Sequence, residues 1–205
     1  MTYSIEFYAL KGHEFAARLQ SQSPALLSEL EARLRADDED EDEDDDASDE
    51  ESDDDDDDDD VIDNEASLRL ILNAARCICQ NDLPADCGEE YFCAFWWLLE
   101  LTSERITICD FQDVRRLSYL EDIGIWPWFQ RRAPSFPLPH SSESYPNAGF
   151  LSWQDMPDFV STGIQNLPPP RDTSTARYAL NARDEFQHVL STLIDDQLDL
   201  VAVLE

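Results

Sequence analysis

A run of acidic residues sets the strongest constraint on what this chain can fold into. Every residue from 37 to 60 is aspartate or glutamate except Ala47, Ser48 and Ser52. Adjacent like charges repel, aspartate disfavours helix interiors, and the run has no apolar surface to bury. Because helical patterns lie on both sides of it, we expect residues 37–62 to form a disordered insert rather than a tail.

The rest of the chain has the composition of a folded protein. The run supplies most of the net charge of −33, and the remaining residues include five Trp and ten Phe. A length of 205 residues corresponds to one domain of ordinary size plus an insert. We therefore predict residues 1–36 as the N-terminal strand and helices, 37–62 as the insert, and 63–205 as the main part of the same domain.

The two ends of the chain have the alternating pattern of strands. "TYSIEFYAL" near the N-terminus alternates between two sets of side chains, and "DLVAVL" closes the chain. The segments between them are mostly helical in pattern, as in "SPALLSELEARLR", "NEASLRLILNAARCICQ", "GEEYFCAFWWLLELTSER", "DVRRLSYLEDIG" and "TARYALNARDEFQHVLSTLIDD". The predicted fold class is α+β, a mostly helical single domain with a small sheet formed by the N- and C-terminal strands. Because so few strands are predicted, a nearly all-α fold is the alternative.

Two shorter segments also carry local signals. "RITICDF" has the pattern of a short strand. Ser152 and Asp155 have the spacing of a capping box, which predicts a short helix at "SWQDMPDFV".

The five cysteines are at positions 77, 79, 87, 93 and 109. Cys77 and Cys79 lie two apart on a predicted helix, so their side chains point to different sides of it and do not suit one metal ion. We interpret the cysteines as reduced core thiols, which suggests a cytoplasmic protein, with metal binding and redox chemistry as weaker alternatives. No apolar stretch reaches the roughly 20 residues that a membrane-spanning helix needs.

The sequence contains none of the common catalytic motifs. His13, His140 and His188 have no metal-binding spacing, and the five glycines are isolated, so no phosphate-binding loop is present. There is also no G-x-S-x-G motif, although a hydrolase could still assemble from distant residues. We predict a protein that is not an enzyme and has no cofactor.

The passage "IGIWPWFQRRAP" combines aromatic and arginine residues. Residues of these types are enriched where proteins bind one another. One interpretation is a docking surface for a protein partner, formed by Trp126, Trp128, Phe129, Arg131 and Arg132. The other is that the aromatic residues pack on the core and the two arginines are solvated.

Three functions are possible for the acidic run, and a fourth possibility is that it has no function. Fully stretched, it carries a carboxylate about every 4 Å, close to the phosphate spacing of about 3.4 Å along one DNA strand, so it could compete for a basic nucleic-acid groove. It could bind Ca²⁺ or Mg²⁺ loosely. It could fold back on arginines of its own domain, namely Arg115, Arg116, Arg131 and Arg132. It could also be only a solvated insert.

The chain resembles an uncharacterised bacterial family known as a domain of unknown function. The resemblance rests on the start "YSIEFYAL", the helix "LRLILNAARCICQ", the passage "FPLPH…YPNAGFLSWQDM" and the end "LDLVAVL". It covers most of the chain except the acidic run. It implies a bacterial, cytoplasmic protein and supplies no catalytic or binding residues.

These patterns favour a non-enzymatic acidic interaction protein. A basic protein is the expected partner, and an immunity-type inhibitor of a nuclease-like or nucleic-acid-modifying toxin would act by electrostatic steering and by blocking a positive groove. The acidic charge disfavours direct binding to nucleic acid or to a membrane. The alternatives are a chaperone of basic histone-like or ribosomal proteins, and an enzyme without a recognisable motif. The predicted partner-binding residues are Asp53, Asp54, Asp55, Asp56, Asp57, Asp58, Asp59 and Asp60 together with the five residues of the aromatic and arginine passage.

Overall fold

The computed structural model describes residues 5–41, 64–106, 126–142, 147–164 and 173–204. Its elements, in chain order, are β1 (Ile5–Leu10), α1 (Gly12–Ser21), α2 (Ser23–Glu41), α3 (Asn64–Gln80), α4 (Glu89–Thr102), β2 (Glu104–Ile106), α6 (Trp126–Phe129), β3 (Asn147–Leu151), α7 (Met156–Asp158), the π-helix η1 (Phe159–Ile164), α8 (Thr173–Asp196) and β4 (Asp199–Leu204). In this part of the chain no helix combines the length and the apolar character needed to cross a membrane.

The strands form one antiparallel sheet of four strands in the order β2-β1-β4-β3. The first and last strands pair along their whole length, from Ile5 opposite Leu204 to Leu10 opposite Asp199. This pairing confirms the predicted small sheet of N- and C-terminal strands. The nearly all-α alternative is wrong, because β1 and β4 are the two central strands.

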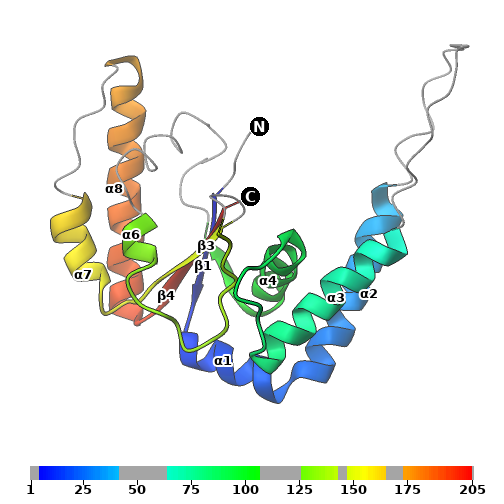
Figure 1. Cartoon of the computed structure of the whole chain (residues 1–205). Helices are drawn as coiled ribbons and strands as arrows, with labels where there is room; N and C mark the ends of the chain where they lie inside the picture. The colour runs from blue at the N-terminus through cyan, green and yellow to red at the C-terminus, as the bar shows by residue number, and fades with distance from the viewer. Residues whose placement is uncertain (1–4, 42–63, 107–125, 143–146, 165–172, 205) are drawn as a thin grey trace, which may run out of the picture.

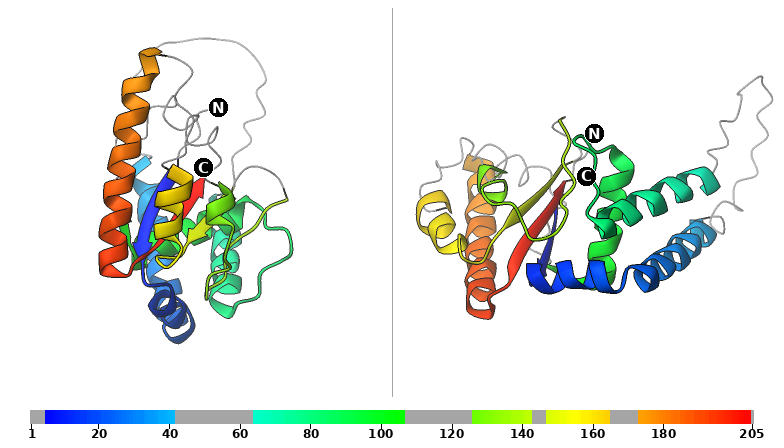
Figure 2. Two further views of the ribbon diagram at one scale, coloured as in Figure 1. Left: turned by 90° about the vertical axis from the view of Figure 1, so that its left-hand side faces the viewer. Right: turned by 60° about the horizontal axis from the view of Figure 1, so that its bottom comes forward.

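Helices cover both faces of the sheet, so the domain has three layers (Figures 1 and 2). Helices α1 to α4 share one core with Tyr8, Val201 and Val203 of the sheet. Helices α6, α7 and α8 and the π-helix share the other core with Phe7, Leu200 and Ala202. The neighbouring residues Phe7 and Tyr8 are both almost fully buried, at 2% and 0% exposure, because they point into different layers.

Helices α2 and α3 form a hairpin that projects from the three-layer body (Figure 1). Its buried residues, among them Leu26, Leu30, Ala74, Ala75 and Ile78, pack into the first core. Helix α2 continues to Glu41, so its backbone extends past the start predicted for the insert at residue 37. Residues 42–62 of the predicted insert lie outside the described residues.

The remaining predicted elements lie only partly within the described residues. Helix α4 is largely buried, as its apolar sequence predicts. The strand predicted at "RITICDF" corresponds to β2, which ends at Ile106 as the structure describes it, and the helix predicted at "DVRRLSYLEDIG" lies outside the described residues. Helix α8 confirms the long final helix.

Asp199, the first residue of β4, connects the sheet to both layers of helices. Its Oδ2 accepts a hydrogen bond from the backbone N–H of Gly12 at the start of α1, and its Oδ1 accepts one from the backbone N–H of Trp153, each at 3.0 Å. The residue is only 9% exposed. A buried carboxylate needs such donors, and here both of its oxygens have one.

Candidate functional site

The acidic run begins in the last residues of α2 and ends before α3, so the α2–α3 hairpin flanks it in the sequence. Arg35 of α2 contacts two carboxylates, with Glu31 on its own helix at 3.3 Å and Glu65 on α3 at 3.4 Å. Glu65 also pairs with Arg69 at 3.3 Å. The hydrogen bond to Glu31 and the charge of Glu65 raise the pKa of Arg35, so it stays charged at any physiological pH.

This ion-pair network joins the two helices close to the point where the acidic run leaves α2 and returns to α3. Exposed ion pairs of this kind contribute little to stability, so the relative position of the two helices depends mainly on the buried side chains that they share with the first core. The end of α2 and the start of α3 both lie at the far end of the hairpin, away from the sheet (Figure 2). The predicted partner-binding residues Asp53 to Asp60 themselves lie outside the described residues.

The predicted docking surface is built on α6 and the turn that follows it. Trp126 begins α6, but its side chain lies outside the described part of the structure. Phe129 is fully buried, and its ring centroid lies 6.2 Å from that of Phe7 and 6.4 Å from that of Phe159. A partner therefore cannot contact Phe129, which packs in the second core beneath the docking surface.

Trp128 and Arg131 form the accessible part of this surface. Trp128 is half-buried against Phe159, with ring centroids 5.2 Å apart. The guanidinium carbon of Arg131 lies 5.1 Å from the centroid of the Trp128 ring, which is the geometry of a cation–π contact. Arg131 itself is exposed. The pair therefore places an exposed positive charge over an aromatic ring.

Arg132 is exposed, and its guanidinium contacts an acidic and an amide group of its own domain. Its Nε lies 2.9 Å from Asp155 Oδ2, and a terminal nitrogen donates to Asp155 Oδ1 at 3.0 Å. The other terminal nitrogen donates to Gln154 Oε1 at 3.0 Å. This two-point contact is the strong form of an arginine–carboxylate pair. Its charge is therefore already matched by a neighbour.

The same contact corrects the capping box predicted at Ser152 and Asp155. The short helix α7 begins at Met156, and the Asp155 side chain makes no capping hydrogen bond. The Ser152 hydroxyl instead accepts from the backbone N–H of Gln154 at 3.4 Å. The predicted short helix is present as α7, but the capping box is wrong, because the Asp155 carboxylate forms a charged contact with Arg132 rather than a capping bond.

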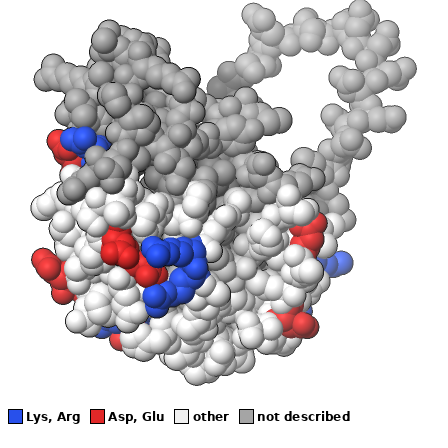
Figure 3. Space-filling view, turned by 60° about the vertical axis from the view of Figure 1, so that its left-hand side comes forward, with Lys and Arg blue, Asp and Glu red and all other residues white. Residues whose placement is uncertain are grey.

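Figure 3 shows the side of the molecule that carries α6, α7 and α8. Where the surface is not grey, basic and acidic side chains touch near the centre of this view and again at its upper left edge, and the area around the central group is largely uncharged. Next to Arg132 there is an open cavity of about 480 Å³, lined among others by Pro134, Phe136, Pro139 and His140. The Pro-rich passage therefore contributes a shallow, mainly apolar groove beside the docking surface.

The segment around His140 is tied to the loop between α3 and α4. The backbone N–H and the hydroxyl of Ser142 donate to the Asp86 carboxylate at 2.7 and 2.9 Å. These two hydrogen bonds, that from the backbone first, lower the pKa of Asp86. The backbone N–H of Cys87 donates to the carbonyl of His140 at 2.8 Å. The His140 side chain is exposed.

A second polar network links β1 to α4 in the first core. The Tyr8 hydroxyl lies 2.6 Å from Glu6 Oε2 and 2.6 Å from Glu100 Oε1, and Trp96 Nε1 donates to Glu6 Oε2 at 2.5 Å. Burial, and then the hydrogen bonds to the two carboxylates, raise the pKa of Tyr8 far above its ordinary value. The phenol therefore stays protonated in the folded protein.

The cysteines described by the structure are free thiols. Cys79 and Cys87 are buried, and burial raises the pKa of both, while Cys77 and Cys93 are half-buried. Cys79 and Cys87 thus confirm the prediction of core thiols, and Cys109 lies outside the described residues. Within the described ranges no group of three or more His, Cys, Asp or Glu residues could hold a metal ion.

Sequence reasoning missed the residues that join distant segments. The Arg35–Glu65 contact, the Tyr8–Glu100 contact and the Asp199 hydrogen bonds all connect residues far apart in the chain. The Glu31–Arg35 and Glu65–Arg69 pairs have a local signal, because residues four apart on a helix are neighbours.

The chain was compared with known families, curated proteins and solved structures. Residues 1–204 match the family described as "Domain of unknown function (DUF7691)". The protein belongs to this family. The match confirms the resemblance to a domain of unknown function, while the bacterial source stays a prediction. No curated protein and no solved structure matches the chain.

Proposed function

We propose that this protein is a non-enzymatic interaction protein whose acidic run binds a basic protein. The observation that carries the proposal is the α2–α3 hairpin: α2 ends and α3 begins at its far end, away from the three-layer body, on either side of the run (Figure 1). A charged segment that joins the chain at this point is attached far from the sheet and its two layers of helices. Buried against its own domain, it would need matching positive charges there.

The intramolecular interpretation of the run has less support. Of the four arginines considered for it, Arg115 and Arg116 lie outside the described residues. Arg132 is paired with Asp155, and it lies on α6's side of the sheet, whereas the hairpin packs on the other side. Capture of the run by Arg132 would require the existing two-point contact to break.

The proposed mechanism divides the work between the run and the folded domain. The run accelerates encounter with a positive surface, an effect that falls as salt increases. It has no aromatic residue, and Ala47 is its one apolar residue, so it offers little specificity. Specificity comes instead from a structured surface, for which the exposed Arg131 on the Trp128 ring is the best candidate.

In its most specific form, the proposal is an immunity-type inhibitor of a basic toxin that acts on nucleic acid. The spacing of carboxylates along an extended run is close to that of phosphates along one nucleic-acid strand. Such a run could occupy a basic groove in place of the substrate. We place the protein in the cytoplasm in this proposal, because the four described cysteines are free thiols.

The test is a comparison of capture experiments at low and high salt. The full chain is compared with a variant in which a short Gly/Ser linker replaces residues 42–63. Arg131→Gln tests the docking surface, with Arg76→Gln on the exposed side of α3 as its matched control. We expect basic proteins to be captured at low salt by the full chain and far less by the deletion variant.

Each outcome separates the hypotheses. If one basic protein is captured and Arg131→Gln weakens its binding, the run steers and the folded surface supplies the specificity. Capture of many basic proteins without any effect of Arg131→Gln would favour the chaperone alternative. If the full chain and the deletion variant capture the same proteins at low salt, the run is a solvated insert and the proposal is wrong.

A further inference from the structure

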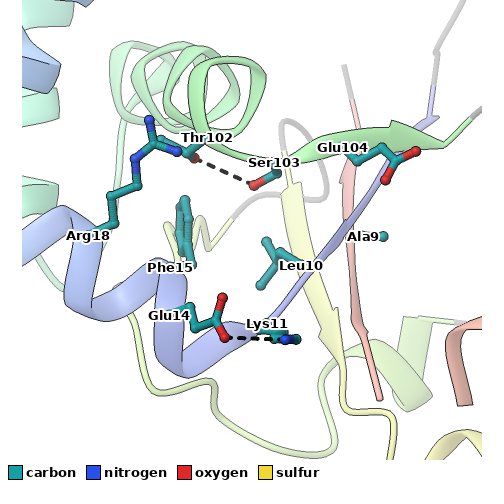
Figure 4. A pocket seen from close by; sticks show the side chains of 9 residues that line it. All are labelled: Ala9, Leu10, Lys11, Glu14, Phe15, Arg18, Thr102, Ser103 and Glu104. Atoms are coloured by element: carbon teal, nitrogen blue, oxygen red, sulfur yellow. Dashed lines mark hydrogen bonds and ion pairs between the residues drawn. The ribbon is translucent and has the colours of Figure 1, made fainter. Parts of the chain in front are cut away.

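A polar pocket lies between α1 and the turn from α4 to β2, on the side of the sheet that faces the hairpin. Its volume is about 310 Å³, which is at the lower end of the range for small-molecule sites. Figure 4 shows the residues that line it, which are Ala9, Leu10, Lys11, Glu14, Phe15, Arg18, Thr102, Ser103 and Glu104. None of these residues belongs to the hairpin or to the predicted docking surface.

Arg18 and Glu104 are the two charges of this pocket that have no ion pair among the described residues, one positive and one negative. Lys11 and Glu14 neutralise each other, with 3.3 Å between Nζ and Oε1. Among the described residues, the Arg18 guanidinium has no hydrogen bond and no ion pair, although the residue is half-buried. A half-buried cation without a counter-charge loses hydration and gains nothing in return, so an anion in the pocket would be favoured.

The wall beside Arg18 carries two hydroxyl groups (Figure 4). The Thr102 hydroxyl donates to the carbonyl of Leu98 within α4. The Ser103 hydroxyl lies 3.5 Å from that of Thr102, which is longer than an ordinary O–H···O hydrogen bond. Because this contact is weak, the Ser103 hydroxyl can turn its proton toward a ligand oxygen. Arg18 and Ser103 together offer donors to one oxyanion.

The remaining surface of the pocket limits which anion fits. Leu10 and Phe15 are core side chains at 6% and 4% exposure, and they give the pocket an apolar floor. Glu14 and Glu104 belong to the lining as well, and their charges oppose a ligand with two negative charges. The lining therefore favours one negative charge attached to an apolar body.

We propose that this pocket binds a small organic monocarboxylate. The carboxylate group contacts the Arg18 guanidinium and the Ser103 hydroxyl, and the apolar part of the ligand rests on Leu10 and Phe15. Arginine suits this role because its planar guanidinium can donate two parallel hydrogen bonds to a carboxylate. This site is independent of the acidic run and of the function proposed above.

The test uses 4-fluorobenzoate as the probe, observed by fluorine NMR during titration with the full chain. We expect saturable binding that Arg18→Gln weakens about tenfold or more, because a hydrogen-bonded charge pair is lost. Arg33→Gln, on the exposed side of α2, is the matched control and should bind like the unchanged protein. Ser103→Ala should weaken binding by a smaller factor.

Two other probes determine whether the carboxylate is what the pocket recognises. 4-Fluorobenzamide has the same apolar body without the charge and should bind far more weakly. Inorganic phosphate should compete poorly. The proposal is overturned if 4-fluorobenzoate does not bind, if Arg18→Gln and Ser103→Ala both leave its affinity unchanged, or if phosphate binds more tightly than 4-fluorobenzoate. Arg18→Gln should keep the thermal transition of the parent, because that guanidinium has no described partner.

Discussion

The backbone N–H of Gly12 donates a hydrogen bond to the carboxylate of Asp199, with 3.0 Å between the nitrogen and Oδ2. The contact joins the start of the first helix to the start of the last strand. Asp199 Oδ1 makes an equivalent contact with the backbone N–H of Trp153 beyond β3. One carboxylate therefore positions three segments that the sequence keeps far apart.

Replacing this carboxylate should destabilise the fold strongly. Asp199→Ala leaves the N–H groups of Gly12 and Trp153 without an acceptor, and we expect a loss of about 2–4 kcal/mol in the free energy of unfolding. Urea denaturation followed by circular dichroism measures the change. Asp195→Ala, at an exposed position of α8, is the control and should stay within about 0.5 kcal/mol of the parent.

Gly12→Ala gives an independent check of the same contact. A Cβ atom at this position would lie 2.9 Å from Asp199 Oδ2 and would push the carboxylate away from its donors. We expect a smaller destabilisation than that of Asp199→Ala. A Gly12→Ala variant as stable as the parent would show that the contact does not contribute as described.

Ionisation of Tyr8 should lower the free energy of unfolding at high pH. Its pKa is raised in the folded protein, first of all by burial, so the unfolded chain loses the phenolic proton more easily. The contribution of Tyr8 is fully present below pH 10, the ordinary pKa. Above that pH it should decline by up to about 1.4 kcal/mol per pH unit. Unfolding by urea between pH 9 and pH 11 measures this slope.

The Tyr8→Phe variant distinguishes the effect of the Tyr8 hydroxyl on stability from the effects of the other tyrosines. The variant keeps the buried ring but removes the hydroxyl that contacts Glu6 and Glu100. At pH 7 we expect a loss of about 1–2 kcal/mol, and above pH 10 a flatter decline than in the parent. A parent and variant with equal slopes above pH 10 would contradict this role of Tyr8.

Ser142 should control the acidity of Asp86. Because Ser142 donates to the carboxylate, the pKa of Asp86 is lowered, and its stabilising effect is present above the ordinary pKa and is lost as pH falls through the lowered one. Ser142→Ala should raise the pKa of Asp86 only part of the way, because the backbone N–H remains. Carbon NMR of the carboxyl group measures the shift. Ser67→Ala on α3 should leave it unchanged.

The Arg132–Asp155 contact should depend on its two-point geometry. Arg132→Lys keeps the charge but can no longer donate two parallel hydrogen bonds, so we expect it to lose nearly as much stability as Arg132→Gln. A double-mutant cycle with Asp155→Asn should give a coupling energy of about 1 kcal/mol. Full retention of stability in Arg132→Lys would show that charge alone is sufficient.

Periodicity was enough to predict the layers that depend on local pattern. The alternation in "IEFYAL" and "DLVAVL" identified the strands that pair at the centre of the sheet, and the apolar middle of α4 identified a buried helix. What periodicity could not indicate was which face of the sheet each helix covers. Phe7 and Tyr8 are both buried because helices cover both faces, and that depends on the packing of the whole chain.

In the candidate sites, too, local pattern predicted some features, while others depend on the packing of the whole chain. The docking surface was predicted from residue types alone, and the structure then separates its members, with Phe129 in the core, Arg132 paired with Asp155, and Arg131 exposed on the Trp128 ring. Arg18 had no local signal, because its pocket is formed by α1 and the end of α4, which are far apart in sequence. Spacing rules detect neighbours along the chain, and these sites depend on neighbours in space.

The order of strands also has a consequence for how the chain folds as it is synthesised. In the sequence β4 follows the other described strands, yet it lies between β1 and β3, so neither of those strands can pair with it until residues 199–204 have been synthesised. Pairing over such a long sequence separation is slow. During this interval the charges between residues 37 and 60 would already have left the ribosome, and their repulsion would oppose aggregation of unfinished chains.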